Sequence, residues 1–254
     1  LLMGGAIDGM LTWPMTNYDR RIGVVYTPYM LTGWEDALEA YSPDGWLYSA
    51  VNDVMNDNGL KFLGPWPEGF NGIATIGECV TELEDKNSVN LRTIPVYPFP
   101  QVIQALGYKT AAIDWTELYT ALQTGVVDGD AGNVIYHDYE YFNDILDCYV
   151  RTKHMFMTAM FLIHNDSFNG LSEEHQQAVY RASEDAVQKQ FEDGKATDEL
   201  YVEKAVEGGM KYAELSDEEL QQNADIVREA IWPEMRSQLG DDLMDVIEEN
   251  AREF

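Results

Sequence analysis

The chain has 254 residues, of which 45% are hydrophobic and 12% aromatic, so it is long and apolar enough to fold around a substantial core throughout. Its 45 acidic side chains outnumber its 16 lysines and arginines and give a formal charge of -29, which would repel a nucleic-acid backbone and an anionic membrane surface alike. These features exclude the disordered and the nucleic-acid-binding classes, and they require that any anionic ligand be held by a local cation at short range.

The first predicted element is a short buried strand and turn at residues 5–9, Gly-Ala-Ile-Asp-Gly. The pattern returns at residues 125–129 as Gly-Val-Val-Asp-Gly. In both segments the first glycine favours the end of a helix, and Asp-Gly favours a turn. Unless the match is due to chance, it indicates two lobes that are built on one pattern.

The middle of the chain predicts a strand, helix and strand in succession. Residues 89–94 are typical of a strand that ends before three closely spaced prolines, and residues 102–106 resume a helix. Residues 111–113 predict a further strand, after which Thr116 is expected to cap a helix that ends at Gly125. This alternation is typical of an α/β sheet.

The last third of the chain becomes helical after one apolar strand. Residues 155–163 form the longest apolar run, which is too short for a membrane span of roughly 20 residues and therefore predicts a buried strand. Ser172 is expected to cap the next helix. Residues 217–249 have helical spacing of apolar positions, and we expect Pro233 and Gly240 to interrupt them.

No motif for catalysis or for metal binding is found in the sequence. There is no nucleophile elbow, phosphate-binding loop, dinucleotide fingerprint or zinc-protease motif. Cys79 and Cys148 lack the spacing of a zinc site, and the sequence leaves open whether they form a disulfide. We therefore expect no enzyme, no cofactor and no metal site. The histidines also lack ligand-type spacing: His137, His154, His164 and His175.

One stretch carries a specific resemblance. Residues 113–129 read Ile-Asp-Trp-Thr-Glu-Leu-Tyr-Thr-Ala-Leu-Gln-Thr-Gly-Val-Val-Asp-Gly. They resemble the aromatic-Ser-Glu-Val-Tyr-Thr-Ala-Leu-Gln-Thr-Gly-Val-Val-Asp-Gly signature of the TRAP transporter solute-binding family, also called the DctP or dicarboxylate-binding family. Leu91 and Arg92 stand in that family's Lys-Ile-Arg position, and residues 105–107 match as well. Weaker similarity extends over nearly the whole chain.

The resemblance implies an α/β, type II periplasmic-binding-protein fold, with two α/β lobes, a ligand cleft between them and a long helix that braces both. We expect residues 1–68 and 158–197 in lobe I and residues 69–157 and 198–254 in lobe II. The family has an opening strand, helix and strand that this sequence lacks. The N-terminal part of lobe I, and a signal peptide before it, are therefore expected to be missing ahead of Leu1.

The resemblance also implies polar ligand contacts. Arg92 occupies the position of the arginine that grips the ligand carboxylate, and a guanidinium offers a planar pair of donors that matches a carboxylate. Asn71 stands where many members have a second arginine, which argues against a simple dicarboxylate. Asn133 lies one place later than the family's ligand-contacting asparagine. The alternative for Arg92 is an ion pair at the surface.

Aromatic residues are the remaining candidates for the cleft. Trp115 falls where the family has a pocket aromatic, and Trp13, Tyr29 and Trp66 lie in predicted loops that would face the ligand. Such rings favour a bulky or flat organic body. For each tryptophan the alternative is an ordinary place in the core.

These features together predict the periplasmic solute-binding protein of a TRAP transporter. It would capture a small organic acid and deliver it to the membrane permease subunits, without contacting nucleic acid or inserting into the membrane. The alternatives are the ligand-binding module of a sensor or of another transport system and, less favoured by the sequence, an enzyme on the same fold.

Overall fold

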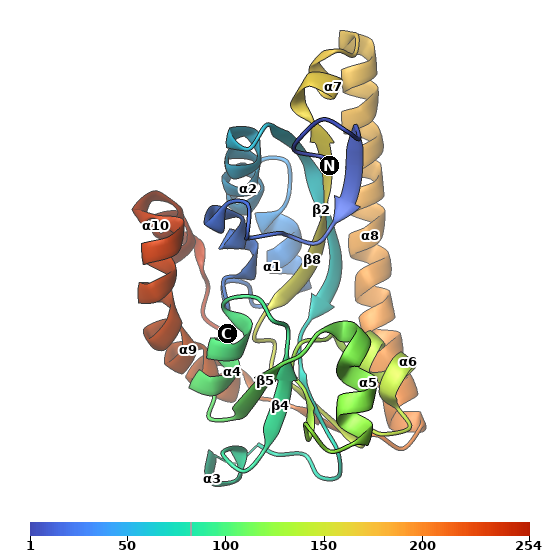
Figure 1. Cartoon of the computed structure of the whole chain (residues 1–254), viewed down its shortest axis with the longest axis vertical. Helices are drawn as coiled ribbons and strands as arrows, with labels where there is room; N and C mark the ends of the chain where they lie inside the picture. Colours follow the sequence, from blue (N-terminus) through green and yellow to red (C-terminus); the bar gives the residue numbers. More distant parts are fainter. Residues whose placement is uncertain (82) are drawn as a thin grey trace.

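The computed structural model describes residues 1–81 and 83–254. Within these residues the strands form two sheets, with the orders β1-β8-β2 and β5-β4-β6-β3-β7-β9 (Figure 1). The strands are β1 Gly9–Thr12, β2 Leu60–Phe70, β3 Ile73–Thr75, β4 Asn90–Thr93, β5 Lys109–Ala112, β6 Gly129–Asp130, β7 Cys148–Arg151, β8 Phe156–His164 and β9 Lys211–Glu214. The helices are η1 Arg20–Tyr26, α1 Trp34–Ala40, α2 Trp46–Asp57, α3 Leu83–Lys86, α4 Phe99–Ala105, α5 Trp115–Gln123, α6 Ile135–Phe142, α7 Asn165–Asn169, α8 Glu173–Glu207, α9 Asp217–Leu239 and α10 Asp241–Asn250.

The first sheet is built around two long strands, β2 and β8, which pair antiparallel along their whole length. β8 is apolar at almost every position and mostly buried, as its sequence predicts. β1 pairs antiparallel with the other edge of β8. β2 runs toward the second sheet, and β8 runs back from it (Figure 1). They therefore carry the chain from one half of the molecule to the other.

β2 is interrupted by two irregularities in its pairing with β8. The register shifts between Phe62 and Gly64, and again between Pro67 and Gly69, so that Glu68 has no Cα partner on β8. A β-bulge of this kind bends the strand and re-aims the side chain of the extra residue. Gly69, which follows the second shift, has a φ of +128°, a conformation that L-residues with side chains rarely adopt.

The second sheet contains the predicted strand, helix and strand unit. β4 lies between β5 and β6 and runs parallel to both, with α4 and α5 as the connecting helices (Figure 1). Arg92 of β4 is in register with Asp130 of β6 and with Ala111 of β5. Because residues in register on parallel strands share a face of the sheet, Arg92 and Asp130 start from neighbouring positions.

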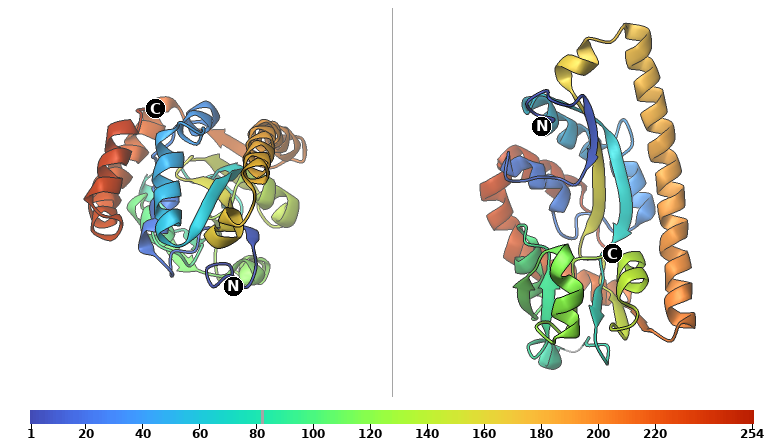
Figure 2. Two further views of the ribbon diagram at one scale, coloured as in Figure 1. Left: turned by 90° about the horizontal axis from the view of Figure 1, so that it is seen from above. Right: turned by 45° about the vertical axis from the view of Figure 1, so that its right-hand side comes forward.

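Helix α8 spans the length of the molecule and contacts both halves (Figure 2). Its 35 residues give a length of about 50 Å. Ser172 caps it, as predicted, by accepting a hydrogen bond from the backbone of His175. Near its far end, Asp198 accepts a hydrogen bond from Trp34 Nε1 at 3.0 Å and forms an ion pair with Arg151 of β7. One buried carboxylate therefore joins the first half to the second.

Helices α9 and α10 pack against α2, α4 and η1 and complete the larger apolar core. Pro233 was expected to interrupt the helical pattern, but α9 runs through it without ending. A proline inside a helix costs about 3 kcal/mol. Its neighbours Ile231, Trp232 and Met235 are buried in the core, and their burial offsets that cost.

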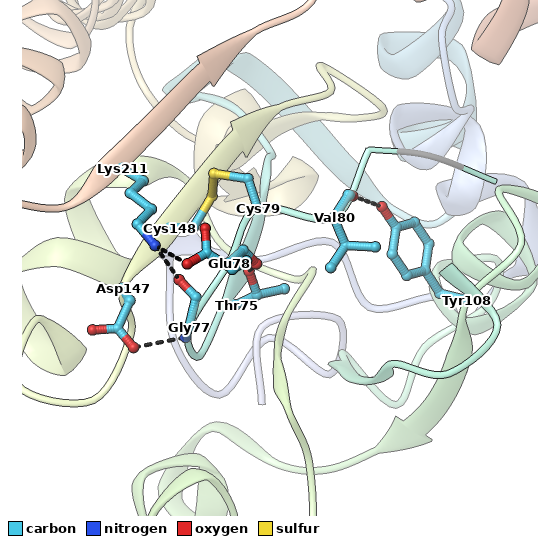
Figure 3. The surroundings of a disulfide bond; sticks show 9 residues. All are labelled: Thr75, Gly77, Glu78, Cys79, Val80, Tyr108, Asp147, Cys148 and Lys211. Atoms are coloured by element: carbon cyan, nitrogen blue, oxygen red, sulfur yellow. Dashed lines mark hydrogen bonds and ion pairs between the residues drawn. A yellow bond between two sulfur atoms is a disulfide. The ribbon is translucent and has the colours of Figure 1, made fainter. Parts of the chain in front are cut away.

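A disulfide joins Cys79, which follows β3, to Cys148 at the start of β7, with 5.3 Å between the two Cα atoms (Figure 3). The pairing that the sequence left open is therefore formed. Around it, Asp147 accepts a hydrogen bond from the amide of Gly77 at 2.7 Å. Polar contacts and the covalent bond together hold the turn after β3 against β7.

Two further local expectations were wrong, and one is not settled. Residues 5–9 form an exposed turn and not a buried strand, because β1 begins only at Gly9. Helix α5 begins two residues earlier than expected, with Asp114 and not Thr116 as its N-cap residue. The boundaries of the two lobes stay a prediction. In the described part of the chain, no helix is long and apolar enough to cross a membrane.

Candidate functional site

A cavity of about 530 Å³ lies where the two halves of the molecule meet. Residues from β1 through η1 and from β2 and β8 line one side, and residues from β4 to α6 line the other. Its walls are mainly aromatic and apolar, with few charged groups. The lining residues are Trp13, Pro14, Tyr26, Glu68, Arg92, Ile94, Pro95, Val96, Asp114, Trp115, Gly132, Asn133, Val134, His137, Tyr141 and Met157.

Arg92 is the cation in this lining, and it is only 2% exposed. Its Nε donates to the carbonyl of Ile113 at 2.8 Å, and its Nη1 donates to Asp130 Oδ1 at 3.0 Å. Among the described residues, Nη2 has no hydrogen-bond acceptor. Gly132 makes the position possible, because a Cβ there would lie 2.6 Å from Arg92 Nη1. The guanidinium is therefore fixed on two sides and available on its remaining side.

The counter-ion of Arg92 was not foreseen from the sequence. Asp130 is fully buried and also accepts a hydrogen bond from the amide of Gly132 at 2.9 Å. Burial raises the pKa of Asp130, and the nearby charge of Arg92 acts in the opposite direction. The resulting ion pair is buried, and not on the surface as the alternative reading of Arg92 had it.

A second buried acid lies beside this pair. Burial raises the pKa of Asp138 well above its ordinary value, and the charge of Asp130 raises it further. Asp138 Oδ1 accepts a hydrogen bond from Asn133 Nδ2 at 2.8 Å. Asp130 and Asp138 are therefore two buried acids that share the charge of Arg92.

Aromatic rings form much of the rest of the cavity wall. Trp115, at the start of α5, is 41% exposed and meets His137 and Tyr141 of α6 at ring-centroid distances of 5.8 and 5.5 Å. Burial lowers the pKa of His137, so its ring is neutral at pH 7. Trp13 and Tyr26 face the same space from the other half of the molecule. A flat or compact organic body would be enclosed by rings from both halves.

Glu68 is the acidic group that enters this space from β2. Its side chain is 24% exposed, and burial raises its pKa to about 7. His137 Nδ1 lies 3.8 Å from Glu68 Oε2, which is beyond hydrogen-bond distance. The hydroxyl of Tyr26 donates elsewhere, to the carbonyl of Pro14 at 3.2 Å. Within residues 1–81 and 83–254, the Glu68 carboxylate has no hydrogen-bond donor.

The structure brings four of the seven predicted ligand-binding residues to the cavity. They are Arg92, Trp115, Asn133 and Trp13. The side-chain amide of Asn133 is already engaged with Asp138, which leaves its oxygen for a solute. The ligand contacts of all four stay predictions.

The other three predicted residues do not line the cavity. Tyr29 is 1% exposed and has a φ of +54°, which turns its side chain into the core, where its hydroxyl donates to the carbonyl of Thr152 at 3.1 Å. Trp66 lies in β2 and packs edge-on against Phe161 at 5.2 Å. Asn71 is fully buried beside Val134, and its side-chain amide has no hydrogen-bond partner in the described structure.

Sequence reasoning missed several lining residues, and two signals could have revealed them. His137 and Tyr141 are four residues apart, which places them on one face of a helix. Glu68 is followed by a glycine within an apolar strand, which is a sign of a bulge. Tyr26 offered no such pattern.

His154 is a buried histidine with a structural role. It is fully buried, and burial lowers its pKa to about 4. With Nε2 protonated it donates to the carbonyl of Ala131 at 3.1 Å, and its Nδ1 accepts from the hydroxyl of Thr152 at 2.7 Å. It thereby ties the segment before β8 to the loop after β6. Among the described residues, no group of three or more histidine, cysteine, aspartate or glutamate side chains could hold a metal ion.

The chain is similar to several proteins of known name. Residues 1–238 match DctP, described as bacterial extracellular solute-binding protein, family 7. The chain is 27% identical over 228 residues to the ectoine-binding periplasmic protein TeaA of Halomonas elongata, across 87% of this chain and 66% of TeaA. It is 27% identical over 164 residues to the ectoine/5-hydroxyectoine-binding periplasmic protein UehA of Ruegeria pomeroyi, across 63% of this chain and 47% of UehA. The chain thus spans two thirds or less of these curated relatives.

Solved structures agree on the fold. A TRAP periplasmic solute-binding protein from Ochrobactrum anthropi aligns with a TM-score of 0.88 at 24% identity, across 98% of this chain and 78% of that one. TeaA in its apo state aligns with a TM-score of 0.89 at 22% identity, across 99% of this chain and 84% of TeaA. The predicted two-lobed α/β fold is confirmed. On the match over residues 1–238, the chain belongs to the DctP family, the bacterial extracellular solute-binding proteins of family 7.

Proposed function

We propose that the protein is the periplasmic solute-binding component of a TRAP transporter, which captures a small organic acid in the cavity between its two halves and delivers it to the membrane permease. One observation carries the proposal. Arg92 is held rigidly at the cavity, with Nε and Nη1 engaged and Nη2 available for a carboxylate. The protein performs no chemistry on the solute in this role.

The names of the relatives support an organic acid. TeaA and UehA are named for ectoine, and an Escherichia coli relative, YiaO, for 2,3-diketo-L-gulonate. Structures similar in fold are described with bound L-gulonate and with bound orotic acid. All these solutes carry a carboxylate. The shared chemical group is therefore the one that Arg92 is suited to hold.

The cavity favours one carboxylate and a compact body. Within the described residues that line it, Arg92 is the only lysine or arginine, so a second carboxylate would have no counter-charge. The rings of Trp13, Trp115 and Tyr141 supply the surface for the rest of the solute. Since these groups come from both halves of the molecule, a solute that touches all of them would favour the closed arrangement. A permease that recognises that arrangement would accept loaded protein only.

Native mass spectrometry of freshly purified protein, followed by calorimetry with a panel of organic acids, tests the proposal. The informative variant is Arg92→Met with Asp130→Asn, because removing both charges avoids leaving either buried and unpaired. We expect at least a hundredfold loss of carboxylate affinity. The control removes the ion pair of Arg236 and Asp245, which joins α9 to α10 and does not line the cavity, and should keep binding. Equal losses in both double variants, or no binding of any organic acid by the unaltered protein, would contradict the proposed function.

A further inference from the structure

We propose that the solute is a zwitterion, which presents its carboxylate to Arg92 and a positively charged, weakly hydrated group to Glu68. This inference rests on the proposed function and adds the charge pattern of the solute. It follows from the charges in the cavity, from the position of Glu68 and from the kind of surface that surrounds it.

The charges of the cavity do not suit a plain anion. The charge of Arg92 is compensated at 3.0 Å by Asp130, and a second buried acid, Asp138, lies beside the pair. Glu68 and Asp114 also line the cavity, whereas His137 is uncharged. The charged side chains of the lining and its buried counter-ion therefore sum to a negative value. A solute with only negative charge would be repelled, as it would by the whole chain with its formal charge of -29.

Glu68 is placed in the cavity by a specific backbone feature. It is the unpaired residue at the second bulge of β2, and Gly69 after it has a φ that requires glycine. In a regular strand, residue 68 would follow the alternation of side chains between the two faces of the sheet, and it would pair with a residue of β8. A bulge that turns an acid toward a cavity serves a purpose other than the stability of the strand, since a half-buried acid without donors is unfavourable.

The surroundings of Glu68 select the kind of cation. Within the described residues the Glu68 carboxylate has no hydrogen-bond donor. The imidazole of His137, which is neutral, lies 3.8 Å away. A primary ammonium would need three acceptors, and Glu68 with the oxygen of Asn133 offers few. An amidinium, iminium or alkylated ammonium needs fewer acceptors and binds to aromatic faces, which Trp13, Tyr26 and Trp115 provide.

Two carboxylates that differ in one charge form the test. Proline betaine and N-acetylproline share a five-membered ring and a carboxylate, but only the first carries a permanent positive charge. We expect calorimetry to show that the unaltered protein binds proline betaine, and likewise ectoine, at least tenfold more tightly than N-acetylproline. Glu68→Gln should weaken both zwitterions at least tenfold and leave N-acetylproline unchanged or tighter. Glu184→Gln is the matched control, because Glu184 lines a different cavity, between α8 and β2.

The outcomes separate the inference from the function on which it rests. If N-acetylproline binds as tightly as the zwitterions, or if Glu68→Gln and Glu184→Gln have equal effects on the zwitterions, the charge pattern is wrong while the binding of organic acids stands. If Arg92 with Asp130 can be neutralised without loss of affinity for any of the three probes, the proposed function fails first. Binding of none of the three probes, together with binding of succinate, would also overturn the inference and leave the function intact.

Discussion

Replacing Glu68 by glutamine is expected to stabilise the ligand-free protein at about pH 8 and to change it little at about pH 5. The pKa of Glu68 is raised by burial from 4.5 to about 7. Between these two values the folded chain binds more protons than the unfolded chain, so stability falls as the pH rises. A tenfold change in proton affinity is worth about 1.4 kcal/mol, so the ionised carboxylate costs the folded state about 3 kcal/mol at pH 8, and less than about 1 kcal/mol at pH 5.

Urea unfolding, followed by tryptophan fluorescence at both pH values, measures this difference. Glutamine keeps the shape of the side chain and removes the charge, so the variant should gain about 2 kcal/mol more at the higher pH than at the lower. Glu184→Gln, in the cavity between α8 and β2, gives the effect of the same substitution elsewhere. An equal change in the free energy of unfolding at both pH values, or a loss at pH 8, would refute the reasoning about Glu68.

Three further predictions concern the arginine and the disulfide, and a fourth concerns pH. Asp130→Asn should increase the affinity for a carboxylate about tenfold in calorimetry, because the charge of Arg92 is no longer compensated, and should lower stability by about 3 kcal/mol in urea unfolding. Gly132→Ala should weaken binding at least tenfold, since a Cβ would meet Arg92 Nη1 at 2.6 Å, while circular dichroism stays unchanged. Replacing Cys79 and Cys148 by serine should cost about 4 kcal/mol in urea unfolding, from the chain entropy of a loop of 69 residues, and an unchanged denaturation midpoint would contradict this. The affinity for a zwitterionic probe should fall as the pH is lowered through about 7, because Glu68 becomes protonated. A pH-independent affinity would exclude Glu68 as the partner of the positive charge.

The fold was largely predictable from local patterns in the sequence. The strand, helix and strand around α5 have the apolar spacing and the glycine stop that their conformations require, and Ser172 caps α8 as expected. Such signals depend on neighbours in the sequence. At Pro233 the local pattern predicts a break in the helix, but burial of the surrounding side chains stabilises a continuous helix.

The site was predictable only in part, because its decisive contacts are not local. Arg92 and Asp130 are 38 residues apart, and only the parallel pairing of β4 and β6 brings them together. The direction of Glu68 depends on a shift of register between two strands that are far apart in the chain. Tyr29 was assigned to the cleft, whereas its left-handed backbone conformation turns it inward.

The division of the tryptophans between core and cavity has an optical consequence. Trp34 and Trp232 are buried among apolar groups, whereas Trp13 and Trp115 are 39% and 41% exposed at the cavity. Indole emission depends on contact with water, so the buried pair reports on whether the chain is folded, and the cavity pair reports on whether a solute has displaced water. Without any attached dye, the protein therefore carries a fluorescent signal of occupancy beside the emission of its other tryptophans, and Trp115→Phe would remove part of that signal.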